Sequence, residues 1–337
     1  MHELGTYPLT VLALGAICMG IFLLIKGGDW TIDGAVWAAD KSGLSKIFIA
    51  ATIVAFGTSA PELFTSINAN LSGYPGVSMG NVVGSNIANV LMVLGIAALV
   101  APIVVKREDV RVDTFVMIGA TLAMAAGIIY GIFSTWMGVA MLASLAIYII
   151  YQYKANRIDV DEVEESVEEG KFDSTKMALL ALFGGIVTLV IGSELLVQGA
   201  IAGGQALGVS EAVIGMTVVA FGTSLPELTT CVAAARKQQS DMIIGGIIGS
   251  NIFNILSIVA ITSIIKPLMV EERFLGFDLP AVLAVTFVLS VIMLTTGRIG
   301  RGIGIAFVVA YLAFIGFQYF GPGSTLMTNA VDSVIIQ

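Results

Sequence analysis

Histidine and cysteine are nearly absent from this sequence, which has one His and two Cys, Cys18 and Cys231, in 337 residues. No CxxC pair is present, so a Cys/His site for zinc or another soft metal has too few ligands. Charged residues are also scarce, at 12% of the chain against 57% hydrophobic residues. This composition excludes an ordinary soluble globular protein.

Ten continuous apolar runs are present, most of them about 20 residues long, which is the length of a membrane-spanning helix. A membrane β-barrel would show shorter, alternating segments of about 10 residues. The sequence therefore predicts an all-α integral membrane protein with ten transmembrane helices. The expected spans are residues 8–27, 46–70, 76–101, 112–132, 135–153, 177–202, 211–235, 241–265, 277–296 and 303–321.

A single acidic stretch divides these spans five and five. Eight acidic residues between Asp159 and Asp173 equal the whole net charge of −8, and the remaining residues sum to zero. Such a segment is typical of a solvated connector, and it lacks the D-x-D-x-D-G pattern of an EF-hand. We expect residues 1–153 to form an N-terminal repeat, 154–176 an acidic cytoplasmic linker and 177–337 a C-terminal repeat.

The two halves share an internal duplication. AFGTSAPE at Ala55–Glu62 recurs 165 residues later as AFGTSLPE at Ala220–Glu227, with seven of eight positions identical. The sequence GSNI likewise occurs at 84–87 and again at 249–252. A repeat of five spans places the second copy upside down relative to the first, which is an arrangement found in many secondary transporters.

Basic residues predict the orientation of the chain. With the N-terminus outside, thirteen Lys and Arg residues face the cytoplasm, and only Lys266 and Arg273 face out. Basic residues concentrate on the cytoplasmic side of membrane proteins. Both termini are therefore expected outside.

Each copy of the first motif places a glutamate directly after a proline inside an apolar span. Pro61 and Pro226 lack the N–H that a helix interior needs, so local unwinding is expected before Glu62 and Glu227. A carboxylate at membrane depth is costly and indicates a functional site. Carboxylates, hydroxyls and freed carbonyls are hard oxygen ligands, which suit Ca²⁺ and Na⁺.

A second polar motif follows in each half, GNVVGSNIAN at Gly80–Asn89 and GGIIGSNIFN at Gly245–Asn254. Ser85 and Asn89 are four residues apart and share a helix face, as do Ser250 and Asn254. Two interpretations stay open for these polar groups: ion ligands, or interhelical hydrogen bonds. The side chains of Asn86 and Asn251, on an adjacent face, could bond the broken helices instead of an ion. Asp29 and Asp33, matched by Glu194 and Gln198, are interpreted as residues at a membrane boundary and not as ligands.

The paired G-T-S-x-P-E and G-x-x-x-G-S-N-I-x-N motifs resemble those of the cation/calcium antiporter superfamily, and within it the prokaryotic type of sodium/calcium exchanger. The resemblance extends from about Gly27 to the C-terminus, with the motifs inside 46–101 and 211–265. It implies ten helices in two inverted five-helix repeats, an ion site between the second, third, seventh and eighth helices, and a sliding pair made of the first and sixth. The implied ligands are Ala55 and Ala220 through their carbonyls, with Thr58, Ser59, Glu62, Ser85, Asn89, Thr223, Ser224, Glu227, Ser250 and Asn254.

The resemblance also implies a function, the exchange of Na⁺ for Ca²⁺ across the cell membrane by alternating access. Some relatives, including potassium-dependent exchangers, carry aspartate at the position of Asn254, so K⁺ independence is expected here. Proton-coupled relatives carry a different motif around their glutamate, which favours Na⁺ as the coupling ion. No enzyme activity, cofactor or nucleic-acid partner is expected, and the chain is expected to work in the lipid bilayer as a monomer. The alternatives are a Ca²⁺/H⁺ antiporter of the same fold, a cation channel and an intramembrane hydrolase.

Overall fold

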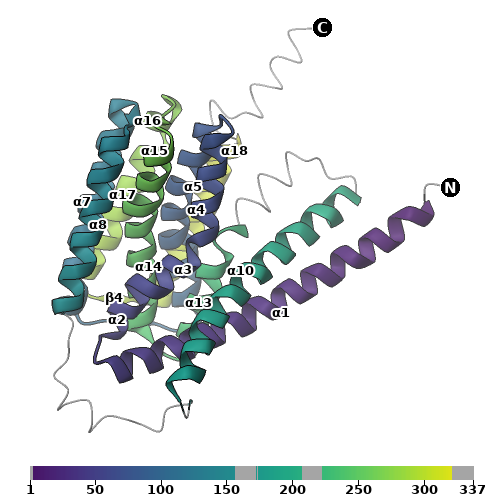
Figure 1. Cartoon of the computed structure of the whole chain (residues 1–337), viewed down its shortest axis with the longest axis horizontal. Helices are drawn as coiled ribbons and strands as arrows, with labels where there is room; N and C mark the ends of the chain where they lie inside the picture. The colour runs from purple at the N-terminus through teal and green to yellow at the C-terminus, as the bar shows by residue number, and fades with distance from the viewer. Residues whose placement is uncertain (1–2, 156–171, 173, 207–221, 321–337) are drawn as a thin grey trace.

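The computed structural model describes residues 3–155, 172, 174–206 and 222–320, without the side chains of 3–10, 204–206, 319 and 320. Ala220, most of the acidic stretch and the first part of the segment 211–235 lie outside these ranges. Within them the chain is almost entirely helical (Figure 1).

The first half begins with a long helix and a broken span. It contains α1 (Glu3–Ser42), α2 (Lys46–Ile49), the π-helical η1 (Ala50–Val54), α3 (Ala55–Thr58), α4 (Ala60–Leu71), α5 (Pro75–Ala88), the π-helical η2 (Asn89–Val93), α6 (Leu94–Val100), β1 (Ile103–Val104), α7 (Arg107–Tyr130), β2 (Ile132–Phe133) and α8 (Thr135–Ala155).

The second half repeats this order where it is described. It contains α10 (Thr175–Ala206), α13 (Leu225–Arg236), α14 (Ser240–Phe253), the π-helical η4 (Asn254–Val259), α15 (Ala260–Ile265), β3 (Leu268–Met269), α16 (Arg273–Gly276), α17 (Asp278–Thr295), β4 (Arg298–Ile299) and α18 (Arg301–Phe320).

Eight helices of the described chain are long and apolar enough to cross a membrane, and the pair Lys46–Thr58 and Ala60–Leu71, bent by 45°, makes a ninth. These correspond to nine of the ten predicted segments, and α13 is the described part of the tenth. The predicted end of the first segment at residue 27 is wrong, because α1 continues to Ser42. Its later turns pack on α13, and two of their carboxylates form ion pairs with Lys237, so the helix need not end where charge begins.

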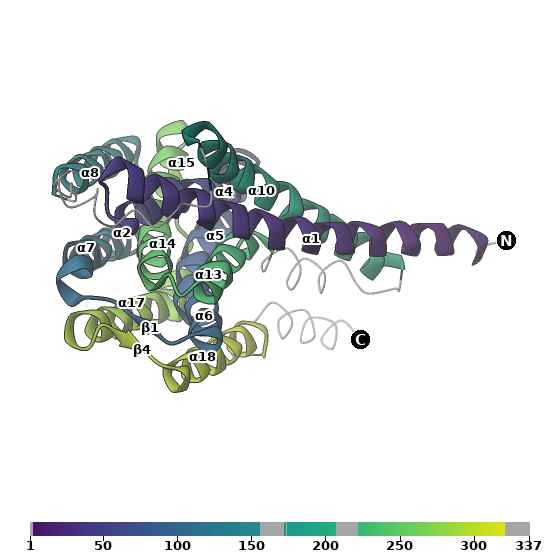
Figure 2. The ribbon, with the colours of Figure 1, turned by 90° about the horizontal axis from the view of Figure 1, so that it is seen from below.

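Helices α1 and α10 lie side by side and extend away from the remaining bundle in both views (Figures 1 and 2). They pack through glycines spaced seven residues apart. A Cβ on Gly20 would lie 2.7 Å from the carbonyl oxygen of Gly192, and one on Gly27 would lie 2.9 Å from that of Gly185. The contacts run from Gly20 to Gly27 along α1 but from Gly192 back to Gly185 along α10. The two helices are therefore antiparallel.

Four two-residue strands join the halves, and the all-α prediction missed them. β1 pairs antiparallel with β4 (Ile103 opposite Ile299), and β2 pairs with β3 (Ile132 opposite Met269). Two of these strands begin just after Pro102 and Pro267, and the residue before a proline favours extended backbone. Ala101 and Lys266 adopt that conformation, with φ of −145° and −152°. Each strand pair therefore links the first half to the second.

The motif helices lie at the centre of the bundle. α14 and η4 are buried along nearly their whole length, and α14 packs closely on η1. A Cβ on Gly249 would lie 2.5 Å from both the Cα and the carbonyl oxygen of Ala51, so a larger residue would separate the two helices. This close approach brings the broken span of one half against the second polar motif of the other.

Candidate functional site

Both predicted helix breaks are present, and each places a glutamate in the first turn of a new helix. The first break lies at Ser59, between α3 and α4, and Glu62 follows in α4. The second lies at Ser224, and Glu227 follows in α13. Proline fits the start of a helix because its missing N–H has no partner there anyway. The positive end of each helix dipole favours the nearby carboxylate.

The two glutamates are buried and are not fully paired. Glu62 is 1% exposed and Glu227 is 4% exposed. The hydroxyl of Ser59 donates to Oε1 of Glu227 at 3.0 Å, while Oε2 of each glutamate has no hydrogen-bond partner in the described chain. Their negative charges repel each other. A buried, incompletely paired carboxylate is unfavourable unless a cation or proton compensates it.

Other predicted ligands line two separate cavities. Ser85, Thr223 and Ser224 line a cavity of about 270 Å³. Thr58 and Ser250 line a gap of about 10 Å³ that Glu227 also lines. The smaller volume is about what a single water molecule needs. Equivalent residues of the two halves therefore line two cavities of very different volume.

The predicted asparagines begin the π-helical segments of the second motifs. Asn89 starts η2 and Asn254 starts η4, and both are 1% exposed. Their Oδ1 atoms and the Oγ of Ser250 have no hydrogen-bond partner within the described part of the chain. A π-helical turn inside an α-helix is frequent at functional sites. Three neutral, buried oxygens thus remain available in addition to the carboxylates.

The described residues contain no group of three or more His, Cys, Asp or Glu side chains that could hold a metal ion, so a cation beside the glutamates would also use neutral oxygens. Among the predicted ligands, the carbonyl of Ala55 accepts from the Ser59 amide at 3.0 Å and from the Thr58 hydroxyl at 3.3 Å. Ala220, its counterpart, is outside the described ranges.

The suggestion that Asn86 and Asn251 bond the broken helices is wrong. Asn86 donates through Nδ2 to the carbonyl of Val82, one turn earlier in its own helix, at 2.8 Å. Asn251 accepts from Nδ2 of Asn89 at 3.0 Å, so it contacts the second motif of the other half.

Sequence reasoning missed Asn81, which supports the backbone at Glu62. Its Nδ2 donates to the Glu62 carbonyl at 3.0 Å and to the Ser66 hydroxyl at 2.9 Å. The positions 165 residues later are Gly246 and Cys231, which cannot form this pair of hydrogen bonds. A search for duplicated polar residues therefore passes over it. A lone amide in an apolar span was the only available signal.

Comparison with known proteins identifies this arrangement. The family model "Sodium/calcium exchanger protein" matches residues 12–154 and again 177–320, so each half matches it separately. The sodium/calcium exchanger MaX1 of Methanosarcina acetivorans is 30% identical over 350 residues, covering 90% of this chain and 97% of that protein. The membrane protein MJ0091 of Methanocaldococcus jannaschii is 35% identical over 311 residues, covering 92% and 99%.

The fold is shared with solved structures of the sodium-calcium exchanger NCX_Mj. One of them, soaked with Na⁺ and Sr²⁺, superimposes with a TM-score of 0.79 at 34% identity, covering 91% of this chain and 98% of the other. These relatives are multi-pass membrane transporters and not enzymes. The chain therefore belongs to the sodium/calcium exchanger family of cation antiporters.

Proposed function

We propose that this protein is a secondary antiporter that exchanges Na⁺ for Ca²⁺ independently of K⁺. The observation that carries the proposal is the pair of buried glutamates, Glu62 and Glu227, whose free oxygens lie among neutral hydroxyl and amide oxygens. Such an oxygen-only set suits both Ca²⁺ and Na⁺. The two ions would compete for the same carboxylates, and this competition couples their movements.

The proposed ligands come from both halves of the chain. Glu62 and Glu227 carry the charge. The neutral oxygens come from the carbonyls of Ala55 and Ala220 and from the side chains of Thr58, Ser59, Ser85, Asn89, Thr223, Ser224, Ser250 and Asn254. The Ser59–Glu227 hydrogen bond supports one shared site, since it joins residues 168 positions apart.

Alternating access follows from two inverted repeats of five spans, ten in all, which we propose for residues 1–153 and 177–337. The antiparallel packing of α1 on α10 supports inversion, because these helices are the first of each half. The unequal volumes of the two cavities support a state open in one direction. In the opposite state α1 and α10 would shift together across the site. An empty site would leave two buried carboxylates without compensation, which disfavours uncoupled movement.

We place the protein in the cell membrane with both termini outside and the linker 154–176 in the cytoplasm. In this orientation the cavity of about 270 Å³, lined by Thr65 and Asn81, faces the exterior.

The charges of Glu62 and Glu227 would be balanced by one Ca²⁺. Exchange of more than two Na⁺ per Ca²⁺ would move net charge, so the rate should respond to membrane potential.

The test is uptake of radioactive calcium into proteoliposomes. An imposed outward Na⁺ gradient should drive uptake equally with and without K⁺, and an imposed pH gradient alone should not. Uptake driven by the pH gradient would instead identify a Ca²⁺/H⁺ antiporter. Uptake that needs no counter-ion would identify a channel.

Asn254→Asp tests why the site is expected to be independent of K⁺. A third carboxylate raises the positive charge needed for neutrality, so we expect a changed ion preference, with Ca²⁺ flux that now responds to K⁺. The measurement is Ca²⁺ flux against Na⁺ concentration, with and without K⁺. An unchanged ion profile would remove this position as a determinant of ion choice.

A further inference from the structure

Asn251 is buried beside the proposed ion site but is not among its ligands. Each end of its side-chain amide makes a contact. Nδ2 lies 3.5 Å from the carbonyl oxygen of Asn86 and 4.0 Å from Sδ of Met117, and Oδ1 accepts from Nδ2 of Asn89 at 3.0 Å. The backbone carbonyl of Asn86 can only accept a hydrogen bond, so the end of the Asn251 side-chain amide that faces it must be the nitrogen.

The orientation of the Asn251 amide also determines the orientation of the Asn89 amide. Because Oδ1 of Asn251 is an acceptor, Asn89 must present its amide nitrogen there, and its own Oδ1 then points elsewhere. That Oδ1 is buried and has no hydrogen-bond donor in the described chain. A buried acceptor without a donor suits a cation ligand.

We propose that Asn251 is a positioning residue, which orients Asn89 so that its carbonyl oxygen, and not its nitrogen, faces the transported cation. The proposal rests on the proposed function of the site. Among the described residues the equivalent pair in the other half is not formed: Asn86 donates to the carbonyl of Val82, and the Oδ1 atoms of Asn86 and Asn254 have no hydrogen-bond partner there. The positioning contact is thus specific to Asn89 in this conformation.

Asn251→Val tests the proposal by removing the acceptor. Loss of a partner that orients a metal ligand typically lowers metal affinity about 10- to 100-fold. We expect Ca²⁺ binding to detergent-solubilised protein to weaken about 10-fold, and the KM of exchange to rise while the rate at saturating Ca²⁺ changes little. Asn251→Asp keeps an acceptor oxygen toward Asn89 and should bind Ca²⁺ more tightly than Asn251→Val. Met117→Leu, which alters only the contact at Nδ2, is the matched control.

A double-mutant cycle separates positioning from a structural role. If Asn251 acts through Asn89, Asn251→Val should have no further effect on Ca²⁺ affinity in an Asn89→Ala background. Additive losses, or parental affinity in Asn251→Val, would overturn the proposal. A parental protein that binds neither Ca²⁺ nor Na⁺ would instead overturn the proposed function.

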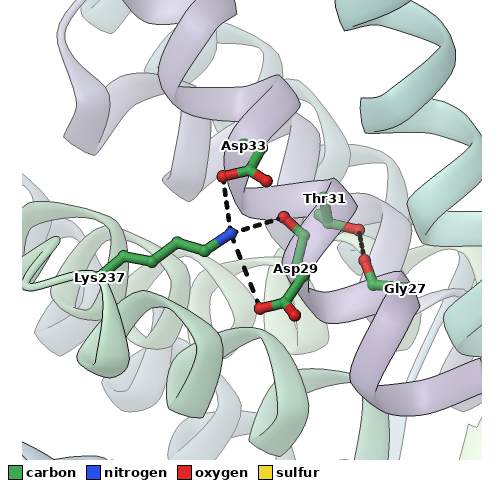
Figure 3. Close-up of polar contacts among 5 residues, drawn as sticks. All are labelled: Gly27, Asp29, Thr31, Asp33 and Lys237. Atoms are coloured by element: carbon green, nitrogen blue, oxygen red, sulfur yellow. Dashed lines mark hydrogen bonds and ion pairs between the residues drawn. The ribbon is translucent and has the colours of Figure 1, made fainter. Parts of the chain in front are cut away.

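A second, independent inference concerns Lys237, which follows α13 and joins it to α1 (Figure 3). Its Nζ lies 2.6 Å from Oδ1 of Asp33, donates to the backbone carbonyl of Asp29 at 2.9 Å, and lies 3.7 Å from the carboxylate of Asp29. The Asp33 side chain is only 12% exposed, so solvent and salt screen its pair with Lys237 weakly.

This ion pair joins the same two helices, α1 and α13, that line the smaller cavity beside Glu227. Ile32 of α1 and Cys231 of α13 line the gap of about 10 Å³, and a Cβ on Gly28 would lie 3.0 Å from the carbonyl of Thr229. The α10–α4 pair, equivalent by the duplication, has no comparable packing. The positions equivalent to Asp29, Asp33 and Lys237 are Glu194, Gln198 and Ser72, which include no cation.

We infer that Lys237, Asp29 and Asp33 form an ionic latch that holds α1 on α13 and so stabilises closure of this cavity alone. In a Cys18→Ser background, Cys231 reports opening through its modification by a methanethiosulfonate reagent. Lys237→Met should raise the modification rate about 10-fold, because losing one hydrogen bond between charged groups changes an equilibrium by about that factor. Lys237→Arg should keep the slow rate, as should Lys41→Met, which removes an exposed charge at the same end of α1. A parental rate in a folded Lys237→Met protein would overturn the latch.

Discussion

Replacing Glu62 or Glu227 with glutamine is expected to lower Na⁺-driven Ca²⁺ uptake by at least about 100-fold. Each substitution keeps the shape of the side chain but removes one of the two charges that we propose hold the ion. Removing one partner of a buried ion pair costs about 3–5 kcal/mol, which is a factor of about 100 or more in binding. The measurement is radioactive calcium uptake into proteoliposomes that contain equal amounts of folded protein.

Asp113→Asn is the matched control for those variants. Asp113 is also a buried carboxylate within a span, 1% exposed, whose Oδ2 has no partner in the described chain, but its Oδ1 accepts from the Tyr148 hydroxyl at 2.8 Å and from Gln152, and it is not among the proposed ligands. The amide keeps an acceptor oxygen for both donors, so exchange should continue. If Glu62→Gln or Glu227→Gln exchanged Ca²⁺ at the parental rate, the assignment of the ion site would fail.

Gly185→Ala is expected to destabilise the protein strongly, although alanine is the better helix former. A Cβ on Gly185 would lie 2.5 Å from the Thr31 hydroxyl and 2.9 Å from the carbonyl of Gly27, inside the contact between α10 and α1. Overpacking of this kind costs about 1–3 kcal/mol. We expect a lower unfolding temperature in detergent, with the loss of exchange following the loss of folded protein.

The neighbouring glycine of α10 provides the control. A Cβ on Gly184 would have no atom within 4 Å, so Gly184→Ala should gain from the higher helix propensity of alanine, by up to about 1 kcal/mol. The two single-methyl changes, one residue apart, should therefore shift the unfolding temperature in opposite directions. Equal shifts would show that the α1–α10 contact does not depend on close backbone approach.

Much of the site could be predicted from its chemistry in the sequence. Glu62 and Glu227 stand out because charge at membrane depth is costly, and Pro61 and Pro226 mark the helix breaks that the structure contains. Asn81 could not be found in this way, since its counterpart is Gly246 and its role depends on a contact with the Glu62 carbonyl. The end of α1 at Ser42 was also missed, because Asp29 and Asp33 form ion pairs with Lys237, some 200 positions away in the sequence.

The sequence by itself determined the apolar spans, the duplication and the two buried carboxylates, since hydrophobic length and buried charge are local properties of the chain. Only the tertiary structure decided that equivalent residues of the two halves make different contacts. In the described chain Asn89 is paired with Asn251 while Asn254 is not paired with Asn86, and α1 packs on α13 while a cavity of about 270 Å³ lies beside Ser85 and Thr223. These differences come from contacts between segments more than 130 residues apart, so nearly identical motifs have different surroundings in the two halves.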